Sequence, residues 1–232
     1  MNDEITMTIT FADEMKQYSI KKWQKILSHK FVTEISKNIL PMNKFLFYLE
    51  QDNYFLQVFS GFLQSAKQKT TDIQMKEWLD SLYISTVDFE MGMQKQLLET
   101  ISSVSSNSYI TTQNISPSNT TLEYTRFLMQ ISYNGNINEI VSSMAPCPWT
   151  YLEIAQLLSK HHIDNEVYRN WVKFYCSNES QKQVEKLKQV LDTLGENENQ
   201  DEKSKEGMKN HFAFACNYEY RFWDMAYNLG KP

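Results

Sequence analysis

The sequence predicts an all-α protein, and three features of its composition and pattern support this. Glycine and proline are scarce, with 6 and 5 among 232 residues, which disfavours strands joined by tight turns. Residue types that favour helices are plentiful, including 11 methionines. Apolar residues recur at helical spacing along most of the chain. Because the composition nowhere changes abruptly, residues 1–232 are expected to form a single helical domain.

Helix signals in the first half predict four helices, over 11–27, 31–39, 41–63 and 72–101. Thr10, three positions before Asp13, is placed to cap the first of them. Pro41 follows the interruption at Leu40 and suits the first turn of the long third helix. Residues 102–121 are rich in Ser, Asn and Thr, and we expect a surface loop there between two helical halves.

The second half predicts five further helices, over 122–134, 137–158, 167–175, 178–194 and 208–226. Gly135 and Gly195 are stop signals after the first and fourth of these helices. Residues 195–205 are acidic and are expected to form a solvated linker before the last helix.

Charge and composition limit the classes of partner. The net charge is -5 at pH 7 without a basic stripe, so binding to a nucleic-acid backbone has no electrostatic support. No apolar run is long enough for a membrane span and the beginning of the sequence lacks the pattern of a signal peptide, so we expect a soluble, cytoplasmic protein. The three cysteines, Cys147, Cys176 and Cys216, are too few and scattered for a disulfide framework or a zinc site.

Cys147 lies in the middle of an apolar helical stripe, between Pro146 and Pro148. The stripe consists of Ile137, Ile140, Val141, Met144, Cys147, Tyr151, Ile154, Ala155 and Leu158. Each proline can remove a helical hydrogen bond, so we expect the helix to bend near the thiol. A buried free cysteine is also common without any function, and this stretch alone leaves a structural role open. Cys176 and Cys216 have no comparable acidic neighbours and are expected to be structural.

Two carboxylates interrupt apolar stripes in the same way, Asp52 on the third predicted helix and Glu219 on the last. A buried carboxylate must find a partner or shift its pKa. If the thiol and both acids converge, the thiolate can act as nucleophile, one carboxylate can move its proton, and the other can hold an amine-bearing ring. Glu90 and Asp88 also lie beside an inner helix face, where either acid could be simply solvated.

Histidine chemistry has less support. The four histidines are His29, His161, His162 and His211. None has a glutamate three residues before it, so the Glu-x-x-His pattern of di-iron bundles is missing and we expect no metal site. His29 as a haem ligand stays open. Tyr124, Tyr151 and Tyr175 could each be core residues, or could together surround a flat ligand.

Five motifs occur in a specific order along nearly the whole chain. They are Leu40-Pro41 ahead of Phe45, Tyr48-Leu49-Glu50-Gln51-Asp52, Tyr124-Thr125, Pro146-Cys147 with Trp149 and Tyr151, and Tyr218-Glu219-Tyr220 followed by Phe222-Trp223-Asp224-Met225-Ala226-Tyr227. In this order they resemble the thiaminase II family (TenA, aminopyrimidine aminohydrolases). The resemblance implies a haem-oxygenase-like helical bundle that uses no haem.

The resemblance also implies a site and a reaction. The family's nucleophile falls on Cys147, its pyrimidine-holding acid on Asp52 and its acid/base on Glu219, although the two acids could exchange roles. Its ring-contacting aromatics fall on Phe55, Tyr124, Tyr151 and Tyr175. The implied reaction is hydrolysis of 4-amino-5-aminomethyl-2-methylpyrimidine, or of thiamin, to hydroxymethylpyrimidine in thiamin salvage. It needs no cofactor, and the family suggests a homotetramer.

Two other classes of function stay open. Pro148 directly follows the expected nucleophile and disfavours helical backbone at Cys147, which could re-aim the sulfur. This favours, as the alternative, a non-enzymatic pyrimidine- or thiamin-binding or regulatory protein on the same fold. The third class is a haem or metal protein.

Overall fold

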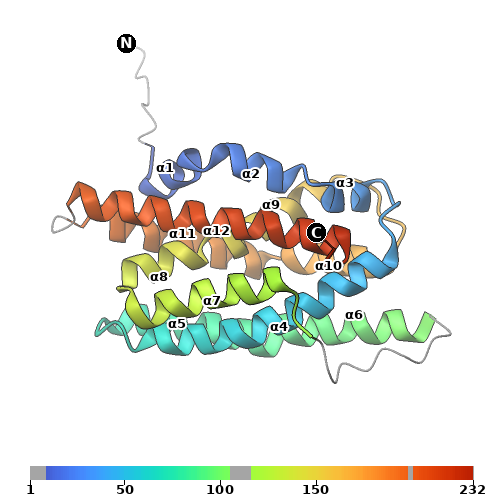
Figure 1. Cartoon of the computed structure of the whole chain (residues 1–232), viewed down its shortest axis with the longest axis horizontal. Helices are drawn as coiled ribbons and strands as arrows, with labels where there is room; N and C mark the ends of the chain where they lie inside the picture. The colour runs from blue at the N-terminus through green and yellow to red at the C-terminus, as the bar shows by residue number, and fades with distance from the viewer. Residues whose placement is uncertain (1–8, 105–115, 198–200, 232) are drawn as a thin grey trace, which may run out of the picture.

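The protein is a bundle of α-helices (Figure 1), seen in a computed structural model that describes residues 9–104, 116–197 and 201–231. Its elements are α1 (Phe11–Tyr18), α2 (Ile20–Leu27), α3 (Lys30–Ser36), α4 (Met42–Lys67), α5 (Ile73–Ile84), the π-helix η1 (Ser85–Glu90), α6 (Met91–Val104), α7 (Asn119–Asn134), α8 (Ile137–Met144), α9 (Pro146–Leu158), α10 (Glu166–Tyr175), α11 (Asn178–Gly195) and α12 (Glu202–Asn228). The described ranges contain no strand, which confirms the all-α prediction. Within those ranges, each helix is too short or too polar to span a bilayer.

The long helix α12 organises the bundle. In Figure 1 it runs along the molecule with α1 and α2 on one side and α7 and α8 on the other. It also packs against α4 and α9. Helix α12 begins at Glu202, so the predicted linker is shorter than 195–205, and its residues 198–200 lie outside the described part. Most of the predicted 102–121 loop, residues 105–115, lies outside it too, while α7 already begins at Asn119.

Three predicted helices are interrupted. Thr10 accepts a hydrogen bond from the Asp13 N–H as predicted, but the first helix breaks at Ser19 into α1 and α2. The predicted 137–158 helix breaks at Ala145, between α8 and α9. The predicted 72–101 helix contains η1, in which an inserted residue shifts the phase of the side chains that follow.

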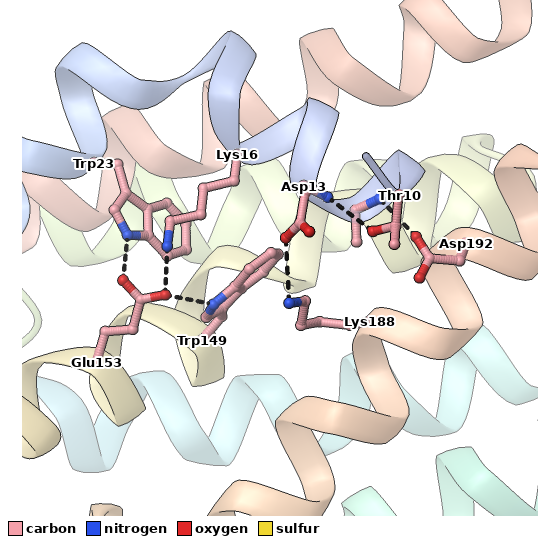
Figure 2. A network of polar contacts seen from close by, with 9 residues as sticks. Thr10, Asp13, Lys16, Trp23, Trp149, Glu153, Lys188 and Asp192 are labelled. Atoms are coloured by element: carbon pink, nitrogen blue, oxygen red, sulfur yellow. Dashed lines mark hydrogen bonds and ion pairs between the residues drawn. The ribbon is translucent and has the colours of Figure 1, made fainter. Parts of the chain in front are cut away.

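Helix α9 is held against α1 and α2 by a polar network on its outer side (Figure 2). The Glu153 carboxylate accepts hydrogen bonds from Lys16 Nζ at 2.6 Å, Trp23 Nε1 at 2.8 Å and Trp149 Nε1 at 2.7 Å. Trp149 follows Cys147 by two residues, which is about 200° around a helix. The network therefore fixes the opposite face of α9 from the one that carries the thiol.

Candidate active site

A cavity of about 660 Å³ lies between α4, α5, η1, α8, α9, α10 and α11. Its walls are mainly apolar, and the polar groups among them include Glu90, Cys147, Tyr151 and Tyr175. Because Phe89 is exposed to solvent and also lines it, the cavity reaches the surface. Its size and lining are typical of a small-molecule site.

Asp52 lies behind this cavity, on the inner face of α4, and is 4% exposed. It accepts hydrogen bonds from Tyr48 Oη at 3.0 Å and from Gln94 Nε2. Tyr48 precedes Asp52 by one helical turn, which brings its hydroxyl to the carboxylate. The hydroxyl also accepts a hydrogen bond from Trp171 Nε1 at 3.1 Å. The carboxylate is therefore held by a buried network that leads back into the aromatic core.

Glu219 reaches the same region from α12 and is 2% exposed. Its Oε1 accepts a hydrogen bond from Tyr124 Oη at 2.6 Å. Its carboxylate also lies close enough to the Cys147 thiol for each group to shift the pKa of the other. Burial raises the pKa of Glu219 from 4.5 to about 7, and the contacts with Tyr124 and Cys147 limit this rise. A carboxyl with such a pKa can both accept and return a proton near neutral pH.

Cys147 lies in the wall of the cavity, in the first turn of α9. The expectation that Pro148 takes Cys147 out of helical backbone is wrong, because the residue is within α9. Helix α9 begins at Pro146, so both prolines fall in a first turn, where N–H groups have no helical acceptor to lose. Ala145, which separates α8 from α9 two residues before the thiol, keeps helical backbone angles (φ -62°, ψ -38°).

The thiol is electrostatically coupled to three carboxyl groups. Burial raises the pKa of Cys147 well above its ordinary value, and the charges of Glu219, Glu90 and Asp52 raise it further. The thiol is therefore protonated near neutral pH, and a nucleophilic role requires a base to take its proton. Burial likewise raises the pKa of Asp52 well above the usual range, with Glu90 and then Glu219 adding to the effect.

Glu90 is an acid that we expected could be simply solvated, and the structure places it in the cavity wall. Its Oε1 accepts a hydrogen bond from Tyr175 Oη at 2.6 Å, and burial raises its pKa from 4.5 to about 7. Gln94, one turn further on, is fully buried against Asp52. Asp88 is exposed, as a solvated acid should be. The phase shift in η1 has no counterpart in the apolar pattern of the sequence. Glu90 was therefore noted beside an inner face but not assigned to the site, and Gln94 was missed.

The expected aromatic residues divide into two pairs. Tyr151 and Tyr175 line the cavity, with ring centroids 4.9 Å apart. Phe55 and Tyr124 also lie 4.9 Å apart, behind the cavity on the side of Glu219. Cys147, Tyr151 and Tyr175 therefore line the cavity directly. The two expected acids and the pair Phe55 and Tyr124 lie behind its wall.

His29, the residue left open as a haem ligand, is already bonded within the chain. His29 caps α3, because its Nδ1 accepts a hydrogen bond from the Phe31 N–H at 3.1 Å. Its Nε2 lies 3.6 Å from the Asp224 carboxylate. Both ring nitrogens are thus engaged by the chain. Among the described residues, no three His, Cys, Asp or Glu side chains are grouped as metal ligands would be.

Comparisons with known proteins agree with this arrangement. The sequence profile described as the TENA/THI-4/PQQC family matches residues 19–229. A Bacillus subtilis protein named aminopyrimidine aminohydrolase is 28% identical over 217 residues, which cover 94% of this chain and 89% of that protein. A protein of the same name from Halalkalibacterium halodurans is 27% identical over 222 residues, covering 95% and 96%.

Solved structures show the same fold. A TenA homologue from P. horikoshii matches with a TM-score of 0.83 and 27% identity, covering 96% of this chain and 100% of that one. A Shewanella denitrificans protein described as having a heme oxygenase-like fold matches with a TM-score of 0.68 and 13% identity, covering 93% and 91%. The predicted haem-oxygenase-like architecture is confirmed.

Proposed function

The chain belongs to the TENA/THI-4/PQQC family, and from this premise we propose that it is an aminopyrimidine aminohydrolase of thiamin salvage. Its substrate is 4-amino-5-aminomethyl-2-methylpyrimidine, with thiamin as a second substrate, and its product is hydroxymethylpyrimidine. The observation that carries the proposal is the contact between a cavity-lining thiol and a buried carboxyl whose pKa is about 7. Relatives of that name, similar over nearly the full chain, support the choice of substrate.

In the proposed mechanism, Cys147 adds to the electron-poor pyrimidine ring while Glu219 takes the thiol proton. The addition removes the aromaticity of the ring, so the bond from the exocyclic methylene carbon to its amine can break. The amine, protonated as an ammonium group, leaves with the bonding electron pair as ammonia. The oxygen of water then bonds to the methylene carbon, and the proton that water loses passes to the released ammonia. The carbon–sulfur bond breaks, and Glu219 returns its proton to the thiolate. A group with a pKa of about 7 suits both transfers.

Asp52 is proposed to bind the amino group and the ring nitrogen. Its anchors, Tyr48 and Gln94, hold the carboxylate in place before substrate arrives. The aromatic residues Phe55, Tyr124, Tyr151 and Tyr175 are proposed to contact the ring faces and edges. The raised pKa of Asp52 allows it to share a proton with the ring nitrogen. The opposite assignment, with Asp52 moving the proton and Glu219 holding the ring, can be tested in the same assay.

The test is ammonia release from the aminomethylpyrimidine. We expect the parent protein and Cys176→Ala to release ammonia, because Cys176 is half-buried and does not line the cavity. Cys147→Ala is expected to bind the pyrimidine without releasing ammonia. Equal turnover by Cys147→Ala and the parent would overturn the nucleophile assignment. If the parent binds the pyrimidine tightly without turnover, the alternative is favoured, a non-enzymatic binding or regulatory protein. Pro148 was the residue that suggested this alternative.

We further propose the domain organisation, location and oligomeric state of the protein. A single domain over residues 1–232, a cytoplasmic location and a homotetramer follow from composition or from the family resemblance. Light scattering on the purified protein tests the tetramer.

A further inference from the structure

Glu90 has one carboxylate oxygen to spare for a ligand. Tyr175 Oη donates to Oε1, and within the described part of the chain no group donates to Oε2. Glu90 is half-buried and lines the cavity, so a ligand there can reach this carboxylate. The π-helix η1 places the residue there, since it ends at Glu90 and sets the phase with which α6 continues.

The ionisable groups around Glu90 are acidic. Its lining contains two charged residues, Glu90 and the rim residue Glu179, and no Lys, Arg or His. Behind the lining lie Asp52 and Glu219, whose charges are felt at Cys147 together with that of Glu90. The walls beside Glu90 are apolar, so these charges are weakly screened. Such a cavity attracts a cation and repels an anion.

The two substrates of the proposed function share one electrostatic property. An aminomethyl group is an ammonium cation at neutral pH, and the thiazolium of thiamin carries a fixed positive charge. Each leaves with the electron pair of the broken bond and so becomes neutral, as ammonia or as a thiazole. A carboxylate beside the leaving group therefore favours its charged, departure-ready form.

We propose that Glu90 binds the cationic leaving group and so makes the cavity select pyrimidines with a positively charged substituent over neutral or phosphorylated ones. The inference rests on the proposed function. With the ring held near Cys147 by Asp52 and Glu219, the substituent extends into the cavity, whose wall includes Glu90 and Tyr175. Tyr175 orients the carboxylate and leaves Oε2 for the ligand.

The test compares ligands of different charge in a background that cannot turn them over. Calorimetry on Cys147→Ala and on Cys147→Ala with Glu90→Gln measures binding of three pyrimidines. They carry an aminomethyl, a hydroxymethyl or a phosphorylated hydroxymethyl group. We expect Glu90→Gln to weaken the aminomethyl ligand about tenfold, to leave the hydroxymethyl ligand unchanged, and to strengthen the phosphorylated one. Asp88→Asn, exposed on the same π-helix, is the matched control and should change none of them.

Binding of the neutral hydroxymethyl ligand distinguishes a failure of the proposed function from a failure of the role of Glu90. If Cys147→Ala binds no pyrimidine, the proposed function fails. If it binds all three and Glu90→Gln weakens the neutral and cationic ligands equally, only the role of Glu90 is refuted. If Glu90→Gln misfolds and no longer binds the neutral ligand, the inference is tested on Cys147→Ala alone, by comparing its affinities for the cationic, neutral and phosphorylated ligands. A phosphorylated ligand that binds as tightly as the aminomethyl one contradicts the inference.

Discussion

Replacing Glu219 with glutamine is predicted to change how the stability of the protein depends on pH. The folded chain buries this carboxyl to 2% exposure and raises its pKa from 4.5 to about 7. In the unfolded chain the pKa returns to its ordinary value. Between the two pKa values the folded state binds more protons than the unfolded state, so stability falls as the pH rises.

The size of the effect follows from the two pKa values. A pKa difference of about 2.5 corresponds to about 3.4 kcal/mol of unfolding free energy, at 1.36 kcal/mol for each pKa unit. About 2.5 kcal/mol of this is lost between pH 5 and pH 8. Glutamine cannot ionise but keeps an oxygen that accepts from Tyr124. The variant should therefore lose about 2.5 kcal/mol less than the parent over this interval, although Asp52 and Glu90 still contribute in the same direction.

Urea denaturation followed by circular dichroism, at pH 5 and pH 8, measures this difference. Glu206→Gln is the matched control, because Glu206 is exposed on the same helix α12. It should keep the parent's dependence on pH. If Glu219→Gln instead loses as much stability between pH 5 and pH 8 as the parent, the carboxyl does not titrate as a buried group and the reasoning is refuted.

Three further predictions test activity and packing. The kcat/KM of the parent should rise with pH through about 7 as Glu219 ionises, and a profile that is flat between pH 5 and pH 9 contradicts its role as the base. Glu153→Ala should lower the unfolding free energy by about 2 kcal/mol, because three donors lose a charged acceptor; a loss below about 0.5 kcal/mol in urea denaturation disagrees. Gly195→Ala should cost about 1–3 kcal/mol, since a Cβ there overlaps the ring of Phe11. The matched variant is Gly61→Ala, in the middle of α4, where a Cβ meets open space. Its unfolding free energy should rise by about 0.5–1 kcal/mol. Equal changes for the two glycines in the same urea assay would contradict this packing.

Capping signals predicted several helix ends, whereas the start of α12 at Glu202 was predicted too late and the interruptions inside helices were missed. Thr10 caps α1 and Gly135 follows α7, because capping is decided by neighbouring residues. The break at Ser19 was missed because the apolar spacing continues across it. Helix α1 packs against α11 whereas α2 packs against α9, and this difference in partners is not visible in a local pattern.

The site was predictable where a polar residue interrupts an apolar stripe. Asp52 and Glu219 are buried as that interruption suggested, and the thiol of Cys147 is coupled to both. Glu90 was noted beside an inner face with solvation left open, and Gln94 was not found, because the inward direction of both depends on the π-helix η1. The chemical roles of all these side chains remain predictions.

The most direct test of the account is a crystal structure of the parent protein soaked with hydroxymethylpyrimidine. The account predicts the ring beside Cys147, with Sγ about 3–3.5 Å from a ring carbon, Asp52 on the amino group and ring nitrogen, and Glu219 next to the sulfur. A ring bound elsewhere in the cavity, or out of reach of Sγ, would contradict it.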